Sequence, residues 1–238
     1  MNVRFVVADP ERASTRIRVM AMLPYLRRLG VEAQHAVLPH GIAKRRAVFR
    51  SLRDADVVVL QKKLLAGADL YALRRCSRRL VYDLDDAVYL RDRPHPRHGW
   101  TSRTRSARFR RTLRACDGVL AGNAHLAGEV ERFSAAIAIV PSAVPLPDRP
   151  SQTVGRAAST PVVGWTGSSA TLHYLSRIEP VLRSVADRHP FELQVVSDRR
   201  PDLEGVPCVY RPWSEAAEAK ALAGWQVGLM PLPDDPWT

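Results

Sequence analysis

Residues 161–171 read Pro-Val-Val-Gly-Trp-Thr-Gly-Ser-Ser-Ala-Thr, and the positions after them follow a helical periodicity. A short apolar strand, a turn rich in Gly and Ser, and a helix N-terminus together form a common phosphate-binding arrangement. Glycines let the backbone approach the anion, and the free N–H groups of the first helical turn point at it. We therefore predict a phosphate-binding loop in which Ser168 or Ser169 caps the helix; its residues are Gly164, Gly167, Ser168 and Ser169.

The residues around this loop predict a second α/β unit that is only partly contained in the chain. We expect strands at 162–165, 193–196, 208–210 and 227–230, and helices at 170–188 and 215–223. Trp213 follows a strand, where its ring could stack on a base or lie in the core. The last strand is expected to be buried and parallel, with the rest of its domain beyond Thr238. That would expose apolar surface around Leu229, Leu232 and Trp237, so low stability and no activity are expected of the chain alone.

The first half of the chain alternates strand and helix patterns, which predicts a doubly wound parallel sheet. We expect strands at 3–7, 31–38, 56–60, 80–83, 118–121 and 136–140, and helices at 17–29, 42–52, 69–75, 101–115 and 124–133. Pro24 predicts a kink or a late start in the first helix, and a polar loop is expected around Pro94 and Pro96. A proline-rich stretch then separates the halves, giving domains at 1–145 and 161–238 joined by a linker at 146–160.

The composition is that of a soluble globular protein, with 46% hydrophobic and 25% charged residues. No apolar run approaches the roughly 20 residues of a membrane span, and the N-terminus reads as a strand instead of a signal peptide. Three cysteines far apart in the sequence do not indicate a disulfide framework. We therefore expect a cytoplasmic protein, with peripheral contact at the inner membrane surface as a further expectation.

The net charge of +12 is concentrated in the first half. Residues 1–150 hold 28 Lys and Arg against 14 Asp and Glu, a net charge of +14, which leaves −2 for residues 151–238. An anionic partner of the first half is therefore expected: a membrane surface, a phosphorylated acceptor or nucleic acid. The helix at 101–115 is a candidate anion-binding face, with a solvated face as the alternative; its candidate residues are Arg103, Arg110, Arg111 and Arg114.

Three carboxylates, Asp83, Asp85 and Asp86, come directly after the fourth strand of the first half. Ligands bind at the carboxyl edge of open α/β sheets, so these side chains are candidate catalytic residues. They could bind a metal, orient a sugar hydroxyl or hold a base, whereas Asp85 or Asp86 could equally cap the next turn.

Two other segments end at the same predicted edge. Ser14, Arg16 and Arg18 begin the first helix, where a cap and two guanidinium groups could hold an anion. Lys62 closes the third strand and is either a ligand-binding cation or a solvated lysine. His125 follows Asn123, and capping of the helix by Asn123 is favoured over a role for this histidine.

Taken together, these motifs resemble the GT-B glycosyltransferases of the family 4 type, also classed as family 1 or group 1. The matching stretches occur in the same order along nearly the whole chain; they are residues 14–19, 58–62, 81–89, 117–126, 140–142, 163–168 and 227–232. The resemblance implies one complete Rossmann-like domain for the acceptor and a partial second one for a nucleotide-sugar. It also implies no metal or other cofactor, and retention of the anomeric configuration. Where the family usually has a catalytic His, this chain has Asp83, Asp85 or Asp86.

The favoured hypothesis is therefore a glycosyltransferase acting on a glycan, lipid-linked or small-molecule acceptor. Its donor diphosphate would be held by the glycine loop, with help from Arg16 and with Trp213 against the base. The acceptor or its charge would meet Ser14, Arg18, Lys62 and the arginine-rich helix. The alternative is a non-catalytic basic module that binds nucleic acid or another polyanion, although no known reader motif is present.

Overall fold

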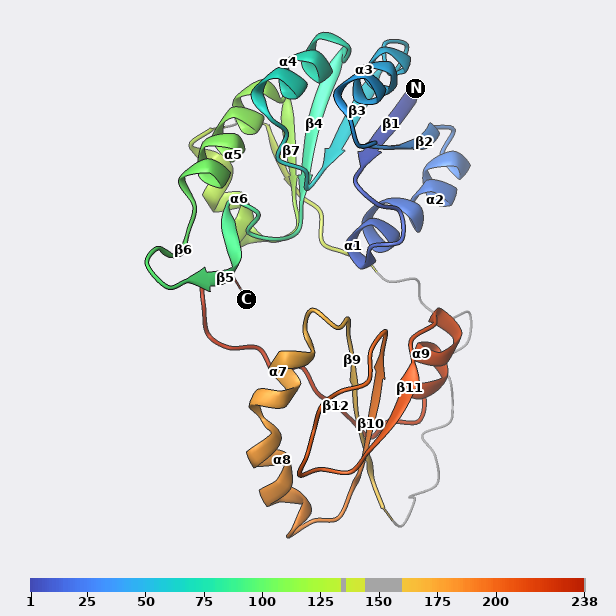
Figure 1. Cartoon of the computed structure of the whole chain (residues 1–238). Coiled ribbons are helices and arrows are strands. Elements are labelled where there is room, and N and C mark those ends of the chain that lie inside the picture. The colour runs from blue at the N-terminus through green and yellow to red at the C-terminus, as the bar shows by residue number, and fades with distance from the viewer. Residues whose placement is uncertain (134–135, 144–159, 238) are drawn as a thin grey trace. The chain divides into compact units, whose positions relative to one another are not determined.

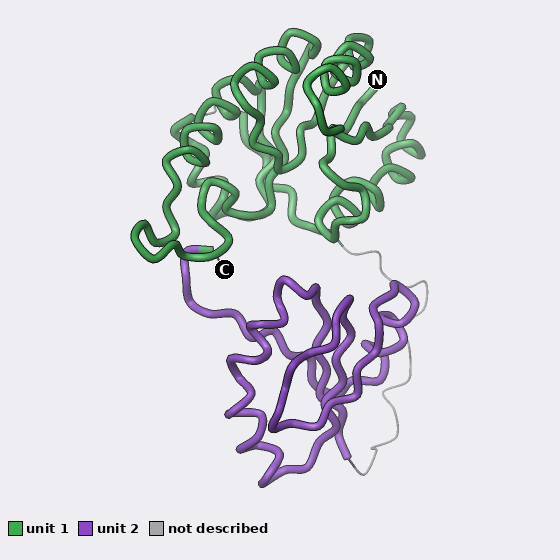
Figure 2. Tube along the Cα trace, viewed as in Figure 1, with its two compact units in different colours: residues 1–145, 237 green, residues 146–236, 238 purple. Residues whose placement is uncertain are grey.

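The computed structural model describes residues 1–133, 136–143 and 160–237. The chain forms two compact units, Met1–Pro145 with Trp237, and Leu146–Pro236 (Figure 2). The predicted linker at residues 146–160 lies, except for Thr160, outside the described residues, so that boundary stays a prediction.

Unit 1 is built on a six-stranded parallel sheet with the order β2-β1-β3-β4-β7-β8 (Figure 1). Its strands are β1 (Asn2–Val7), β2 (Glu32–Val37), β3 (Val57–Gln61), β4 (Arg79–Leu84), β7 (Gly118–Ala121) and β8 (Ile137–Ile139). Apolar residues bury both faces, as in β3, where Val58 and Leu60 join the core on one face and Val59 the core on the other. The chain runs from β1 to β2 on one side and then to β3 on the other, so the strand order reverses between β1 and β3.

Helices cover both faces of this sheet. They are α1 (Ala13–Thr15), a π-helical turn η1 (Arg16–Met20), α2 (Leu23–Arg28), α3 (Ile42–Ser51), α4 (Gly67–Arg75), α5 (Arg103–Ala115) and α6 (Ala124–Glu131). Val19 and Leu23 pack with Phe5 on one face, whereas Phe49 and Leu113 join the core of the other. The helix predicted at 17–29 is interrupted at residues 21–22, and Pro24 stands in the first turn of α2, so this proline marks a break instead of a late start.

The loop predicted around Pro94 and Pro96 is wrong in part. Residues Leu90–His95 (β5) and Gly99–Thr101 (β6) pair as an antiparallel hairpin, and Gly99 turns the chain with φ of +53°. The sequence does not reveal the hairpin because β5 is mostly exposed and lacks the apolar alternation of a half-buried strand.

Unit 2 holds a four-stranded parallel sheet with the order β11-β10-β9-β12. Its elements are β9 (Val162–Thr166), α7 (Leu172–Arg177), α8 (Glu179–Ala186), β10 (Glu192–Ser197), β11 (Cys208–Pro212), α9 (Glu215–Leu222) and β12 (Val227–Gly228). Trp165, Leu175 and Leu193 form its core. The single helix predicted at 170–188 is two helices, because Pro180 sits in the first turn of α8 and cannot continue α7.

The expectation of a buried strand at 227–230 is wrong. β12 is parallel to β9 but covers only two residues at the edge of the sheet, and Val227 is 48% exposed. Leu232 is exposed as expected, whereas Leu229 packs against the unit 2 core and Trp237 against the unit 1 core. These two side chains are half-buried, so they contribute only in part to the predicted apolar surface.

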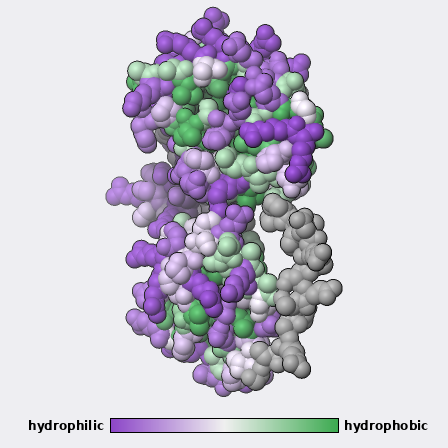
Figure 3. Space-filling view, turned by 90° about the vertical axis from the view of Figure 1, so that its right-hand side faces the viewer, coloured by the Kyte–Doolittle hydropathy of each residue, from purple (hydrophilic) through white to green (hydrophobic). Residues whose placement is uncertain are grey.

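Hydrophilic residues make up most of the surface seen in Figure 3, between smaller hydrophobic patches. Across the described residues, no helix is both long and apolar enough to cross a bilayer.

Candidate functional site

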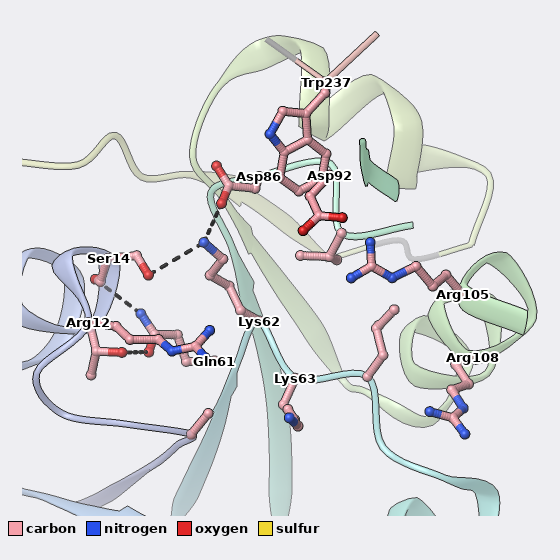
Figure 4. A pocket seen from close by; sticks show the side chains of 14 residues that line it. Arg12, Ser14, Gln61, Lys62, Lys63, Asp86, Asp92, Arg105, Arg108 and Trp237 are labelled. Carbon is pink, nitrogen blue, oxygen red and sulfur yellow. Dashed lines mark hydrogen bonds and ion pairs between the residues drawn. The ribbon is translucent and has the colours of Figure 1, made fainter. Parts of the chain in front are cut away.

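The carboxyl edge of the unit 1 sheet carries a polar pocket beside the point where the strand order reverses. Ligands of open α/β sheets bind at such a switch point. The pocket has a volume of about 420 Å³, which lies within the range of small-molecule sites. Its walls come from the segments that follow β1 and β3, from the β4–β5 connection and from α5; the lining residues are Ala8, Arg12, Ser14, Thr15, Gln61, Lys62, Lys63, Leu64, Asp86, Val88, Asp92, Arg105, Arg108 and Trp237 (Figure 4).

Lys62 is the centre of a charged cluster in this pocket. Its ammonium Nζ bonds to an Asp86 carboxylate oxygen, lies 3.2 Å from Asp85 Oδ1 and 3.4 Å from Ser14 Oγ. Among the described residues, Lys62 is the one non-glycine with a positive φ, 54°. Backbone strain of this kind concentrates at functional sites, and here it turns the chain at the end of β3 toward the two carboxylates. The structure thus brings together Ser14, Lys62, Asp85 and Asp86, as predicted from the sequence.

The cluster changes the proton affinity of its members. Burial lowers the pKa of Lys62, but the negative charges of Asp86 and Asp85 outweigh it, so the pKa is raised and the ammonium stays charged. Burial also raises the pKa of Asp85, against the opposing effect of Lys62. Asp85 Oδ1 is buried against the Lys62 ammonium, whereas Asp86 is about half exposed and faces the pocket.

Asp83 and Arg18 form a separate, buried ion pair. The Arg18 Nη2 nitrogen lies 2.5 Å from Asp83 Oδ1, and the two side chains are only 3% and 7% exposed. The Arg18 Nη1 nitrogen also donates to the Val140 carbonyl at 2.8 Å and to Ser142 Oγ at 3.3 Å. The pair therefore ties η1 to the ends of β4 and β8. Its buried geometry gives both residues a positioning function, beside the anion-binding and catalytic roles predicted for them.

Thr15 and Gln61 hold the first helix against the pocket. Thr15 Oγ1 donates to Gln61 Oε1 at 2.8 Å, and Gln61 Nε2 donates to the Ser14 carbonyl at 3.1 Å. Both side chains are buried. These two side chains were not predicted from the sequence, although a polar Gln at the end of an apolar strand is a detectable signal of a buried hydrogen bond.

Several cations of the pocket were also missed. Arg12, Lys63, Arg105 and Arg108 line it, whereas the four arginines chosen from the sequence do not. These four, Arg103, Arg110, Arg111 and Arg114, are exposed on α5. Helical periodicity alone cannot identify the pocket side of α5, since arginines surround much of the helix. His125 is exposed, and Asn123 caps α6 by accepting from the Leu126 N–H at 2.8 Å, which confirms the capping assignment.

In unit 2 the predicted phosphate loop follows β9, but its details differ from expectation. α7 begins at Leu172 after Thr171, so neither Ser168 nor Ser169 caps it. Instead the Ser169 N–H and Oγ both donate to the Asp198 carboxylate, the latter at 2.8 Å. A carboxylate of the chain thus occupies an N–H that was expected to face a phosphate.

The two glycines of this segment are required by close packing. Gly164 lies inside β9, and any Cβ there would overlap the Trp225 ring. A Cβ on Gly167 would lie 2.6 Å from the Trp165 ring and 2.9 Å from Thr171 Oγ1. Trp213 is half-buried just after β11, and its backbone N–H donates to the Ser197 carbonyl at 2.9 Å.

The topology of unit 2 still places this loop where ligands bind. β10 and β11 extend to one side of β9 and β12 lies on the other, so the strand order reverses between β9 and β12. The Gly167 loop leaves the carboxyl end of β9 at this point. Within the described part of the chain, no group of three or more His, Cys, Asp or Glu side chains is arranged to hold a metal ion.

No protein-family model matches the chain, and no curated protein matches it. Solved structures are similar in fold. Acinetobacter baumannii MurG is 12% identical with a TM-score of 0.51, over 95% of this chain and 70% of that one. The lipopolysaccharide outer core galactosyltransferase WaaB, in its apo form, is 11% identical with a TM-score of 0.57, over 96% and 73%. TarM is 7% identical with a TM-score of 0.55, over 77% and 38%. The chain therefore has a GT-B-like α/β fold, which confirms the predicted fold class.

Proposed function

We propose that the protein is a glycosyltransferase that moves a sugar from a nucleotide-diphosphate donor to an acceptor hydroxyl. The observation that carries this proposal is the cluster of Lys62, Asp85 and Asp86, which opens into a pocket at the switch point of the unit 1 sheet. The GT-B-like fold supports the reaction class. In this proposal the unit 1 pocket binds the acceptor, and the loop after β9 in unit 2 binds the donor.

Asp86 is the best candidate for the group that receives the acceptor proton. Its carboxylate lines the pocket, is about half exposed, and forms an ion pair with the Lys62 ammonium. Asp83 is less suitable because Arg18 occupies its carboxylate, and Asp85 does not line the pocket. The acceptor oxygen forms a bond to the anomeric carbon, the bond from that carbon to the diphosphate breaks, and the hydroxyl proton goes to Asp86.

The donor diphosphate would be bound by backbone N–H groups after Gly167, such as that of Ser168, because the Gly167 N–H already donates to the Val196 carbonyl. Cations would stabilise the charge of the leaving group. Stacking of Trp213 on the base and assistance from Arg16 are parts of the same proposal. So are independence from a metal or other cofactor, and a glycan or lipid-linked acceptor. A retaining outcome belongs to the proposal as well, and it requires the acceptor hydroxyl to attack the anomeric carbon from the face that the diphosphate leaves. The alternative of a polyanion-binding module rests on the charge of the first half alone.

A sugar-transfer assay tests this function. The release of nucleoside diphosphate from UDP-, GDP- and ADP-sugars is measured with soluble and lipid-linked acceptors. Asp86→Asn should lower the rate by about 10²–10⁴-fold, the range of general acid–base catalysis, without changing the fold. Arg114→Gln, which removes an exposed charge outside the pocket, should leave the rate unchanged. Equal rates for wild type and Asp86→Asn would contradict the role of Asp86.

A further inference from the structure

The unit 1 pocket contains more positive charge than its carboxylates balance. Its lining includes five cationic side chains, Arg12, Lys62, Lys63, Arg105 and Arg108, against the acids Asp86 and Asp92. Lys62 is neutralised by Asp86 and Asp85. The Arg12 Nε nitrogen lies 3.9 Å from Asp9 Oδ2, close to the longest distance of an ion pair. The excess charge therefore belongs to Lys63, Arg105 and Arg108.

These three side chains are held at the pocket by their backbones or by neutral partners. Lys63 follows the strained Lys62 in a tight turn, in which the Lys63 N–H donates to the Gln61 carbonyl at 2.6 Å. Arg105 donates to the Leu90 carbonyl, at the start of the β5–β6 hairpin. Arg108 lies one turn further along α5. Among the described residues, no carboxylate forms an ion pair with any of the three; the remaining acid of the pocket, Asp92, lies beyond ion-pair distance of each.

The cations lie apart from the first helix. Figure 4 shows Arg105 and Arg108 of α5 across the pocket from Arg12 and Ser14, with Lys62 and Asp86 between them. Leu64 and the buried Val88 contribute apolar lining. A ligand in this pocket could thus place a hydroxyl at Asp86 while a second group reaches the cations.

We propose that the acceptor carries a phosphate or carboxylate group, which Lys63, Arg105 and Arg108 bind while its reacting hydroxyl lies at Asp86. This rests on the proposed function, which makes the pocket ligand an acceptor. Charge-assisted hydrogen bonds to an anion are the strongest that these side chains form. An uncharged acceptor would leave the three cations without an anionic partner among the described residues. The arginines on the other sides of α5 are not part of this site, because they lie outside the pocket.

Binding of glucose 1-phosphate, glucuronate and glucose to the whole chain, measured by calorimetry, tests the proposal. The anionic probes should bind at least about tenfold more tightly than glucose, the effect of one charge-assisted hydrogen bond. The double variant Lys63→Ala/Arg108→Ala should lose this preference. Arg110→Ala/Arg114→Ala, which removes the same number of charges from exposed positions outside the pocket, should keep it. Vesicles with and without a polyprenyl phosphate distinguish a lipid-borne phosphate from a soluble one.

Equal binding of glucose and glucose 1-phosphate would overturn the proposal, and so would an unchanged preference in the Lys63→Ala/Arg108→Ala variant. Circular dichroism of the variants separates loss of binding from loss of folding, and the single substitutions provide folded alternatives. The test needs no donor and no turnover. A chain that binds the anionic probes through these residues but never binds a nucleotide-sugar would retain the anion site and refute the glycosyltransferase function.

Discussion

The Arg18 guanidinium and the Asp83 carboxylate are both almost fully buried, so each depends on the other for its charge balance. Breaking such a pair leaves an uncompensated charge in the interior. Arg18→Met is therefore expected to lower the free energy of unfolding by about 3–5 kcal/mol in urea denaturation. Arg103→Met, at an exposed position of α5, should change it by no more than about 0.5 kcal/mol. Similar small effects for both variants would show that the pair does not support the fold.

The single residue Asp85 also makes the folding stability depend on pH. Burial raises its pKa above 3.8, so the folded state holds this proton more tightly than the unfolded state does. Between pH 3.8 and the raised folded value, Asp85 therefore reduces stability as the pH rises. Asp85→Asn should remove this decrease, so the slope of the unfolding free energy against pH becomes more positive in that window, as measured by urea denaturation at a series of pH values. An unchanged pH dependence would contradict the assignment.

At the scale of elements, the Asp198 carboxylate accepts hydrogen bonds from the loop between β9 and α7. Hydrogen bonds from the Ser169 side chain and backbone lower the pKa of this carboxyl, so it is charged at neutral pH and competes with a phosphate for the Ser169 N–H. Asp198→Ala should therefore tighten binding of a nucleoside diphosphate, as measured by calorimetry. Weaker binding in Asp198→Ala would instead mean that the carboxylate itself binds the ligand, for example a ribose hydroxyl.

The elements also show what the sequence could reveal. Apolar runs such as Val58–Leu60 predicted the strands of unit 1 closely, because a buried parallel strand needs apolar residues on both faces. Ser14, Lys62, Asp85 and Asp86 could be grouped in advance, because they follow strands that end at one edge. The β5–β6 hairpin could not, since a polar strand lacks apolar alternation. Phe109 and Leu113 mark the inner face of α5, but no signal in the sequence shows that Arg105 and Arg108 lie at the pocket.

At the scale of the whole molecule, two parallel sheets each present a strand-order reversal with a polar loop at its carboxyl edge. Unit 1 supplies the charged pocket, and unit 2 supplies the Gly167 loop. The first half carries the positive charge of the chain, which matches an anionic acceptor in the unit 1 pocket. The central claim is that the second unit binds a nucleotide-sugar.

Calorimetric titration of the whole chain with UDP-, GDP- and ADP-sugars tests that claim most directly. We expect at least one of these donors to bind, and Gly167→Ala to weaken it, because the added Cβ would lie 2.6 Å from the Trp165 ring and shift the loop. Gly128→Ala adds a methyl group where no atom lies within 4 Å and should bind the donor like the wild type. Binding of none of the donors, or equal binding by wild type and Gly167→Ala, would contradict the account.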